Sequence, residues 1–106
     1  MVKRSLGFSN GEKVVRLLME VQIPVRKGNA GKVDGIMSKA IQDFVAAARP
    51  EAAYFHLRNG KRAAIFIFEE SRPEKLVEYN EALFAALDAE IWIEPVLNLD
   101  ELRSRL

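Results

Sequence analysis

Apolar and more polar positions alternate along residues 14–25, the first strongly patterned part of the chain. The apolar positions of this segment are Leu17, Met19, Val21, Ile23 and Val25. A repeat of two predicts a β-strand with one apolar side and one mixed side. Pro24 is expected to mark the strand end or an unpaired edge, because proline has no amide hydrogen to donate. Residues 1–13 show little periodicity, and we interpret them as an extension with a turn at Asn10-Gly11.

The repeat changes to that of a helix from residue 33 onward. Apolar residues follow at helical spacing: Val33, Ile36, Met37, Ala40, Ile41, Phe44, Val45 and Ala48. This single stripe predicts an amphipathic helix over 33–48, with Gly35 inside it. Arg49-Pro50 is expected to end the helix, because a residue before proline is pushed out of the helical region. Residues 27–31, Lys-Gly-Asn-Ala-Gly, are predicted to form the loop before the helix.

Two strands joined by a tight turn are predicted next. Residues 53–58 alternate again, with Phe55 and Leu57 on one side and Tyr54, His56 and Arg58 on the other. Asn59-Gly60 predicts a two-residue hairpin turn, because such a turn needs positive φ at both central positions. Residues 62–69 are apolar on both faces, which is typical of a strand in the middle of a sheet.

The rest of the chain repeats the helix and strand pattern. Ser71-Arg72-Pro73-Glu74 has the form of a capping box, which predicts that a helix begins there. Apolar residues at helical spacing continue to about Asp88, and residues 91–97 predict the last strand. Asp100 is expected to cap a short terminal helix over 101–105.

These elements predict an α+β fold with the order strand, helix, strand, strand, helix, strand. The expected architecture is ferredoxin-like, with a four-stranded antiparallel sheet and two helices on one of its faces. We interpret residues 1–106 as a single domain with an extension at 1–13, a βαββαβ core at 14–98 and a short C-terminal helix at 99–106.

The face of the sheet that the helices leave uncovered, the open face, has a mixed composition. It is expected to carry Leu18, Glu20, Gln22, Tyr54, His56, Arg58, Trp92, Glu94 and Val96, together with either Phe66 and Phe68 or Ile65 and Ile67. Such a surface is too apolar to face bulk water and too polar for a plain core. We therefore expect a homodimer that packs sheet against sheet and encloses a partly polar cavity.

Composition excludes several classes of protein. The chain has 106 residues, a formal net charge of +1 and no cysteine. A charge this small gives no overall attraction to nucleic acid or to an acidic membrane surface. The lack of cysteine excludes disulfides and thiolate chemistry and is in keeping with a cytoplasmic protein. We find no secretory signal and no apolar run long enough to span a bilayer.

The candidate chemistry depends on His56, the one histidine of the chain. On the open face it could form an acid/base pair with a carboxylate, for which Glu20 is our candidate and Glu94 a further one. The alternative is that His56 is hydrogen-bonded within a dimer interface and has no chemical role. Tyr54, Trp92, Gln22 and Glu94 are candidate ligand-binding residues, since the aromatic rings can stack on a flat molecule. The sequence indicates neither a cofactor nor a metal site, because one histidine and no cysteine make a poor ligand set.

Two other functions fit the same element order. An RNA-recognition module shares it, and residues 61–68, Lys-Arg-Ala-Ala-Ile-Phe-Ile-Phe, faintly match its third strand. Ala64 replaces a stacking aromatic residue, and Glu20 would repel phosphate, so the sequence argues against RNA binding. A non-catalytic interaction or regulatory ligand-binding module is the other alternative.

The element order, the length, the Asn59-Gly60 hairpin and the ending Glu94-Pro95-Val96-Leu97-Asn98-Leu99-Asp100-Glu101-Leu102 together resemble the dimeric α+β barrel superfamily. The superfamily includes muconolactone isomerases and cofactor-free monooxygenases. The resemblance covers residues 14–106 and implies the fold and the homodimer. It implies no active-site residue, because no catalytic motif of the superfamily matches this sequence.

Overall fold

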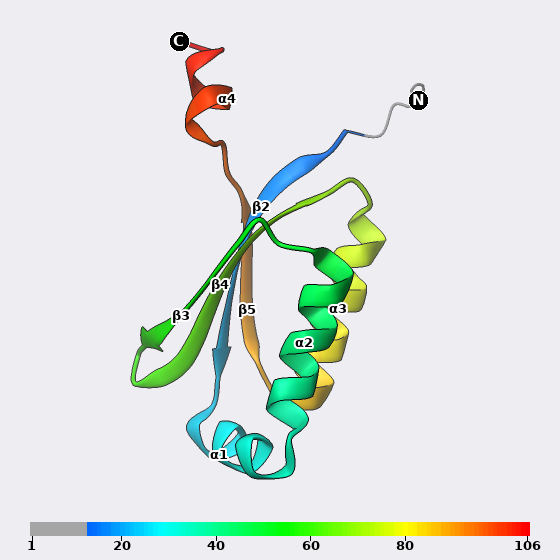
Figure 1. Cartoon of the computed structure of the whole chain (residues 1–106), viewed down its shortest axis with the longest axis vertical. Helices are drawn as coiled ribbons and strands as arrows, with labels where there is room; N and C mark the ends of the chain where they lie inside the picture. The colour runs from blue at the N-terminus through cyan, green and yellow to red at the C-terminus, as the bar shows by residue number, and fades with distance from the viewer. Residues whose placement is uncertain (1–12) are drawn as a thin grey trace.

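The computed structural model describes residues 13–106, and it has the predicted alternation of strands and helices (Figure 1). The elements are β2 (Val15–Ile23), α1 (Val25–Asp34), α2 (Ile36–Ala48), β3 (Ala52–Arg58), β4 (Lys61–Glu70), α3 (Pro73–Leu87), β5 (Glu90–Pro95) and α4 (Leu99–Arg103). The predicted turn at Asn10-Gly11 lies outside the described residues. No helix in the described part of the chain is both long enough and apolar enough to cross a membrane.

The four strands form one antiparallel sheet in the order β3-β4-β2-β5. Helices α2 and α3 lie side by side on the same side of this sheet (Figure 1). The α+β architecture is compatible with a ferredoxin-like fold, as the pattern of apolar positions predicts. Strands β4 and β2 occupy the centre of the sheet, so residues of these two strands face the helices on one side and the open face on the other.

The core lies between the helices and the sheet, and aromatic rings fill its centre. The ring of Phe44 on α2 lies 4.7 Å from that of Phe66 and 5.6 Å from that of Phe68, measured between centroids. Tyr79 on α3 meets Phe44 edge to face at 5.3 Å. Edge-to-face contacts of this kind add to the stabilisation from burial alone. Phe66 and Phe68 therefore belong to the helix side of the sheet, which assigns Ile65 and Ile67 to the open face.

The hairpin between β3 and β4 turns at the predicted place. Asn59 has φ of 55° and Gly60 has φ of 73°, so both central residues adopt the left-handed conformation that this turn requires. The strand β2 ends at Ile23, and Pro24 marks its end as predicted, but Val25, which the alternation assigned to the strand, begins helix α1.

The predicted loop at residues 27–31 is wrong, because these residues lie within helix α1. Its first turn is closed by a 2.8 Å hydrogen bond that the Gly28 amide donates to the Pro24 carbonyl. Gly28 and Gly31 are the buried residues of α1. A Cβ at Gly31 would lie 3.2 Å from Met37 Cβ, so the close packing of the helix needs a small residue there. Tertiary packing thus overrides the low helix propensity of glycine.

The predicted helix over 33–48 is interrupted at its start. Gly35 lies between α1 and α2 with φ of 82°, and no other residue comes near the position of its missing side chain. Val33 is exposed rather than part of the apolar stripe. A 2.9 Å hydrogen bond from the Ile36 amide to Asp34 Oδ1 helps to begin α2. The left-handed conformation of Gly35 therefore separates two helices where the spacing predicted one.

The helix caps also differ from the prediction. Helix α3 begins at Pro73 with Arg72 as its N-cap and has no side-chain cap, so the predicted box at Ser71 is wrong. The side chain of Glu70 binds the backbone before the helix instead, since its Oε2 accepts hydrogen bonds from the Ser71 and Arg72 amides at 3.1 and 3.2 Å. The capping box occurs at α4 instead. Asn98 and Glu101 bond each other's backbone amides there, and this excludes Asp100 as the cap.

Helix α4 projects from the end of the sheet (Figure 1) and is held there by Arg16. The Arg16 guanidinium lies 3.1 Å from Glu101 of α4 and 3.1 Å from Glu69 of β4, and it also pairs with Glu51. The hydrogen bond to Glu101 is the main reason why the pKa of Arg16 is raised. One cation therefore joins three segments that are distant in the sequence.

Acid is expected to release α4 before the rest of the fold. The backbone hydrogen bond from Asn98, followed by the bond from Arg16, lowers the pKa of Glu101 below its ordinary value of 4.5. Because the pKa is lower in the folded state, the stabilisation is complete above pH 4.5 and is lost as the pH falls through the folded-state pKa. An NMR pH titration should show the α4 amides shifting together below pH 4.5. Shifts that stay unchanged until the whole chain unfolds would contradict this expectation.

Candidate functional site

The open face consists of rows of side chains that run across the four strands. The central row is Tyr54, Ile65, Glu20 and Trp92, in the order of the strands β3, β4, β2 and β5. The rows on either side are Ala52, Ile67, Leu18 and Glu94, and His56, Ala63, Gln22 and Glu90. Directly paired residues in neighbouring strands point to the same side of a sheet. The strand register thus confirms the predicted open face, except that Val96 follows the end of β5.

Glu20 lies in the middle of the open face, and its side chain is only 16% exposed. Its Oε2 lies 2.6 Å from Arg58 Nε and accepts a 3.2 Å hydrogen bond from Gln22 Nε2. The Oε1 of Gln22 in turn accepts a 3.4 Å hydrogen bond from Asn59 Nδ2. These four side chains form a polar network that extends from the hairpin to the centre of the open face, next to the apolar residues Leu18, Ile65 and Ile67.

The structure does not bring His56 together with either candidate carboxylate. Glu20 is two strands away from His56 and bonds Arg58 and Gln22 instead. Glu94 lies on the opposite edge strand. The ring Nδ1 of His56 is 3.3 Å from the Leu57 carbonyl oxygen, and within residues 13–106 the buried Nε2 has no hydrogen-bond partner. His56 therefore forms no pair with Glu20 or Glu94 within residues 13–106.

The two aromatic candidates lie at opposite ends of the central row. Tyr54 is on the edge strand β3 and Trp92 on the edge strand β5, and both are exposed. Three inter-strand spacings separate them, a distance of about 14 Å. Ile65 and Glu20 lie between them, so the row presents two rings with an apolar group and a carboxylate between them.

Sequence reasoning placed Arg58 on the open face but did not pair it with Glu20, and it did not include Asn59. Arg58 and Asn59 come close to Glu20 and Gln22 only because β3 and β2 both pair with β4, and this pairing sets their relative register. The signal available in the sequence was the charge of a lone acidic residue within an apolar strand. Such a carboxylate is expected to have a cationic partner.

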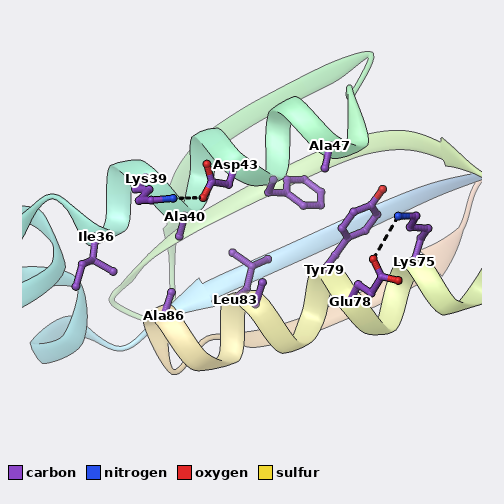
Figure 2. A pocket seen from close by; sticks show the side chains of 12 residues that line it. Ile36, Lys39, Ala40, Asp43, Ala47, Lys75, Glu78, Tyr79, Leu83 and Ala86 are labelled. Atoms are coloured by element: carbon purple, nitrogen blue, oxygen red, sulfur yellow. Dashed lines mark hydrogen bonds and ion pairs between the residues drawn. The ribbon is translucent and has the colours of Figure 1, made fainter.

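A groove between α2 and α3, the helix groove, is a second concave surface, with a volume of about 380 Å³. Figure 2 shows Tyr79 and Leu83 of α3 on its inner side, and charged pairs along the two helices. Lys39 Nζ lies 2.6 Å from Asp43 Oδ2, and Lys75 Nζ lies 3.3 Å from Glu78 Oε1. The charges at the rim of the helix groove are thus already neutralised within each helix.

Tyr79 in the helix groove has a structural role. Its hydroxyl donates a 3.1 Å hydrogen bond to Glu70 Oε1, and its ring packs in the core. Burial, and after it the hydrogen bond to Glu70, raises the pKa of Tyr79 above its ordinary value of 10.0. The phenol thus remains protonated at neutral pH and ties α3 to the end of β4. Among the described residues, no three histidine or acidic side chains gather into a possible metal site.

Comparison with known proteins gives little further information. No protein-family model matches the chain, and no curated protein matches it either. Among solved structures it is similar to "De novo designed protein Ferredog-Diesel", with a TM-score of 0.37 and 15% sequence identity. That match covers 86% of this chain and 91% of the designed chain. A likeness at this level carries no information about function.

Proposed function

We propose that the protein is a cytoplasmic homodimer of the dimeric α+β barrel type that binds a small organic molecule between its two sheets. The observation that carries the proposal is the Glu20–Arg58 ion pair on a sheet face that also carries Leu18, Ile65 and Ile67. The apolar residues of the open face favour a cover that excludes water. Burying an ion pair without polar surroundings is costly. A cover that leaves a small polar cavity around Glu20 satisfies both requirements.

The arrangement of the rows supports a second copy of the chain as the cover. A two-fold axis parallel to the strands, between β4 and β2, places β3 of one protomer over β5 of its partner. Tyr54 then faces the partner's Trp92 in the central row. The same rotation sets Arg58 on β3 over a strand that carries Glu90 and Glu94. The rotation thus brings side chains of opposite charge onto facing strands.

The groups around the cavity suggest the chemistry of the ligand. Glu20 accepts hydrogen bonds from hydroxyl or amine groups, whereas Arg58 and Gln22 donate them to carbonyl oxygens. Tyr54 and Trp92 can stack on a flat ring. We therefore propose a planar molecule with hydroxyl and carbonyl groups as the ligand class. His56, which pairs with neither Glu20 nor Glu94 in the described part of the chain, has no role in the proposed binding.

Light scattering on a sizing column tests the dimer, and Trp92 provides an independent signal. The chain has one tryptophan, and Trp92 is half exposed on the open face of a single chain. We expect twice the mass of the chain at micromolar concentration, with blue-shifted Trp92 emission. Dilution should shift the emission to the red as the mass falls. A monomeric mass at micromolar concentration, with emission unchanged by dilution, would disprove the proposal.

A further inference from the structure

A second groove lies on the helix side of the sheet, next to the edge strand β3. Phe55 pairs with Ala64 and therefore points to the same side as the core. Nevertheless Phe55 is 62% exposed and Leu57 is 77% exposed. The helices thus leave this edge of the sheet uncovered. We call this feature the β3 groove.

The β3 groove has a volume of about 380 Å³, and its walls are almost entirely apolar. Its lining residues are Ile23, Met37, Ile41, Phe55, Leu57, Ala63 and Ala64, with His56 and Arg62 as the polar ones. A volume of this order falls within the range of small-molecule sites, about 300–1,000 Å³. All of these residues belong to one chain. Phe55, Leu57 and Arg62 lie on the helix side of the sheet, opposite to the face proposed for the dimer, so the β3 groove does not require a second copy of the chain.

Arg62 distinguishes the β3 groove from the helix groove. Its Nη2 donates a 2.9 Å hydrogen bond to Asn29 Oδ1 of α1, which is a neutral partner. Within residues 13–106, no carboxylate forms an ion pair with Arg62. Both lysines of the helix groove, by contrast, are paired with carboxylates. The β3 groove thus has a cation whose charge no described residue balances.

The place of the guanidinium depends on a glycine. A Cβ at Gly28 would lie 2.7 Å from Arg62 Nη1 and 3.3 Å from Ile23 Cγ2. Arg62 can therefore rest against α1 only because residue 28 has no side chain. Asn29 then holds the other terminal nitrogen of the guanidinium. Two neighbouring residues of α1 thus position the charge beside the apolar walls.

We propose that the β3 groove binds an amphipathic carboxylate, either an aryl or a medium-chain alkyl carboxylate. The apolar body of the ligand lies against Met37, Phe55 and Leu57, and burial of these surfaces favours binding. The carboxylate pairs with Arg62, whose planar guanidinium can donate two parallel hydrogen bonds to it. A cationic ligand is disfavoured by Arg62, and an uncharged ligand lacks the ion pair.

Calorimetric titration of the full-length protein with decanoate tests the proposal, with decan-1-ol as the uncharged probe. We expect decanoate to bind more tightly than decan-1-ol. The Arg62→Gln variant should bind decanoate about 10-fold more weakly or worse, because the charge-assisted hydrogen bonds are lost. Its affinity for decan-1-ol should stay the same. The Lys75→Gln variant removes a charge of the same sign from the helix groove and should bind decanoate as the wild type does.

A second variant moves the guanidinium and keeps its charge. In Gly28→Ala the new methyl group displaces the flexible end of Arg62, while alanine favours the helix more than glycine does. We expect this variant to keep its circular dichroism spectrum and to lose affinity for decanoate but not for decan-1-ol. Equal affinity of the wild type for the two probes would overturn the proposal. Wild-type decanoate affinity in Arg62→Gln, or its loss in Lys75→Gln, would also overturn it. Light scattering on the same samples reports the dimer separately, so failure of either proposal can be distinguished.

Discussion

Replacing Phe68 with alanine is expected to lower the free energy of unfolding by about 3–5 kcal/mol. Phe68 is 1% exposed, and its ring meets those of Phe44 at 5.6 Å and Tyr79 at 6.0 Å, both edge to face. Alanine would leave a cavity where the central strand β4 meets both helices. Most small domains have a free energy of unfolding of only about 5–15 kcal/mol, so this one substitution is expected to remove a large share of it. Urea denaturation followed by circular dichroism at a fixed protein concentration measures the loss.

The same substitution at Phe84 is the matched control. Phe84 lies on α3 and is 40% exposed, so its removal leaves no closed cavity. We expect Phe84→Ala to cost less than about 1.5 kcal/mol, because surface substitutions away from such features have small effects. Equal losses in the two variants would show that the core is not centred on Phe68.

The second large effect is expected at the proposed dimer interface, from Ile67→Lys. Ile67 is paired with Ala52 and Leu18 on the open face, so no carboxylate is directly opposite to it. A lysine there remains solvated in a single chain, but it would be buried without a partner in the dimer. Loss of a central apolar contact and burial of a charge should raise the dimer Kd by about 100-fold or more. Light scattering over a dilution series measures the change.

Val77→Lys serves as the control for this variant. Val77 is an exposed β-branched residue on α3, on the helix side of the sheet. The substitution introduces the same charge, but away from the proposed interface. We therefore expect it to leave the dimer mass unchanged. A dimer that survives Ile67→Lys, or that is lost in Val77→Lys, would place the interface elsewhere.

The elements that local chemistry controls were predictable from the sequence. Asn59-Gly60 specifies a turn with positive φ, and Pro24 ends a strand because it lacks an amide hydrogen. The helical spacing of apolar residues in α2 and their alternation in β2 continue over enough residues to indicate a helix and a strand, respectively. Predictions failed where contacts with segments distant in the sequence, rather than the local pattern, determine the conformation. Residues 27–31 form a helix because Gly28 and Gly31 pack against other elements, a contact that no local pattern reveals.

The sequence predicted which residues lie on the candidate site, but not which of their side chains interact. Alternation placed Glu20, Gln22, Tyr54 and His56 on one face, and the strand register confirms that placement. The same alternation could not choose between Phe66 with Phe68 and Ile65 with Ile67, because β4 is apolar on both sides. It also could not show that Glu20 pairs with Arg58 rather than with His56.

The sequence by itself determined the four strands, the hairpin, the helices α2 and α3 and which strand residues share a face. Backbone chemistry and the strand and helix repeats act over a few residues, so a local pattern reveals them. Only the tertiary structure decided which side of β4 meets the helices, how Glu20 is paired, and that Arg62 lies against Gly28 beside the β3 groove. These features depend on the register of neighbouring strands and on close packing between segments far apart in the chain. Both are settled by burial and by the pairing of buried polar groups, which only the assembled fold creates.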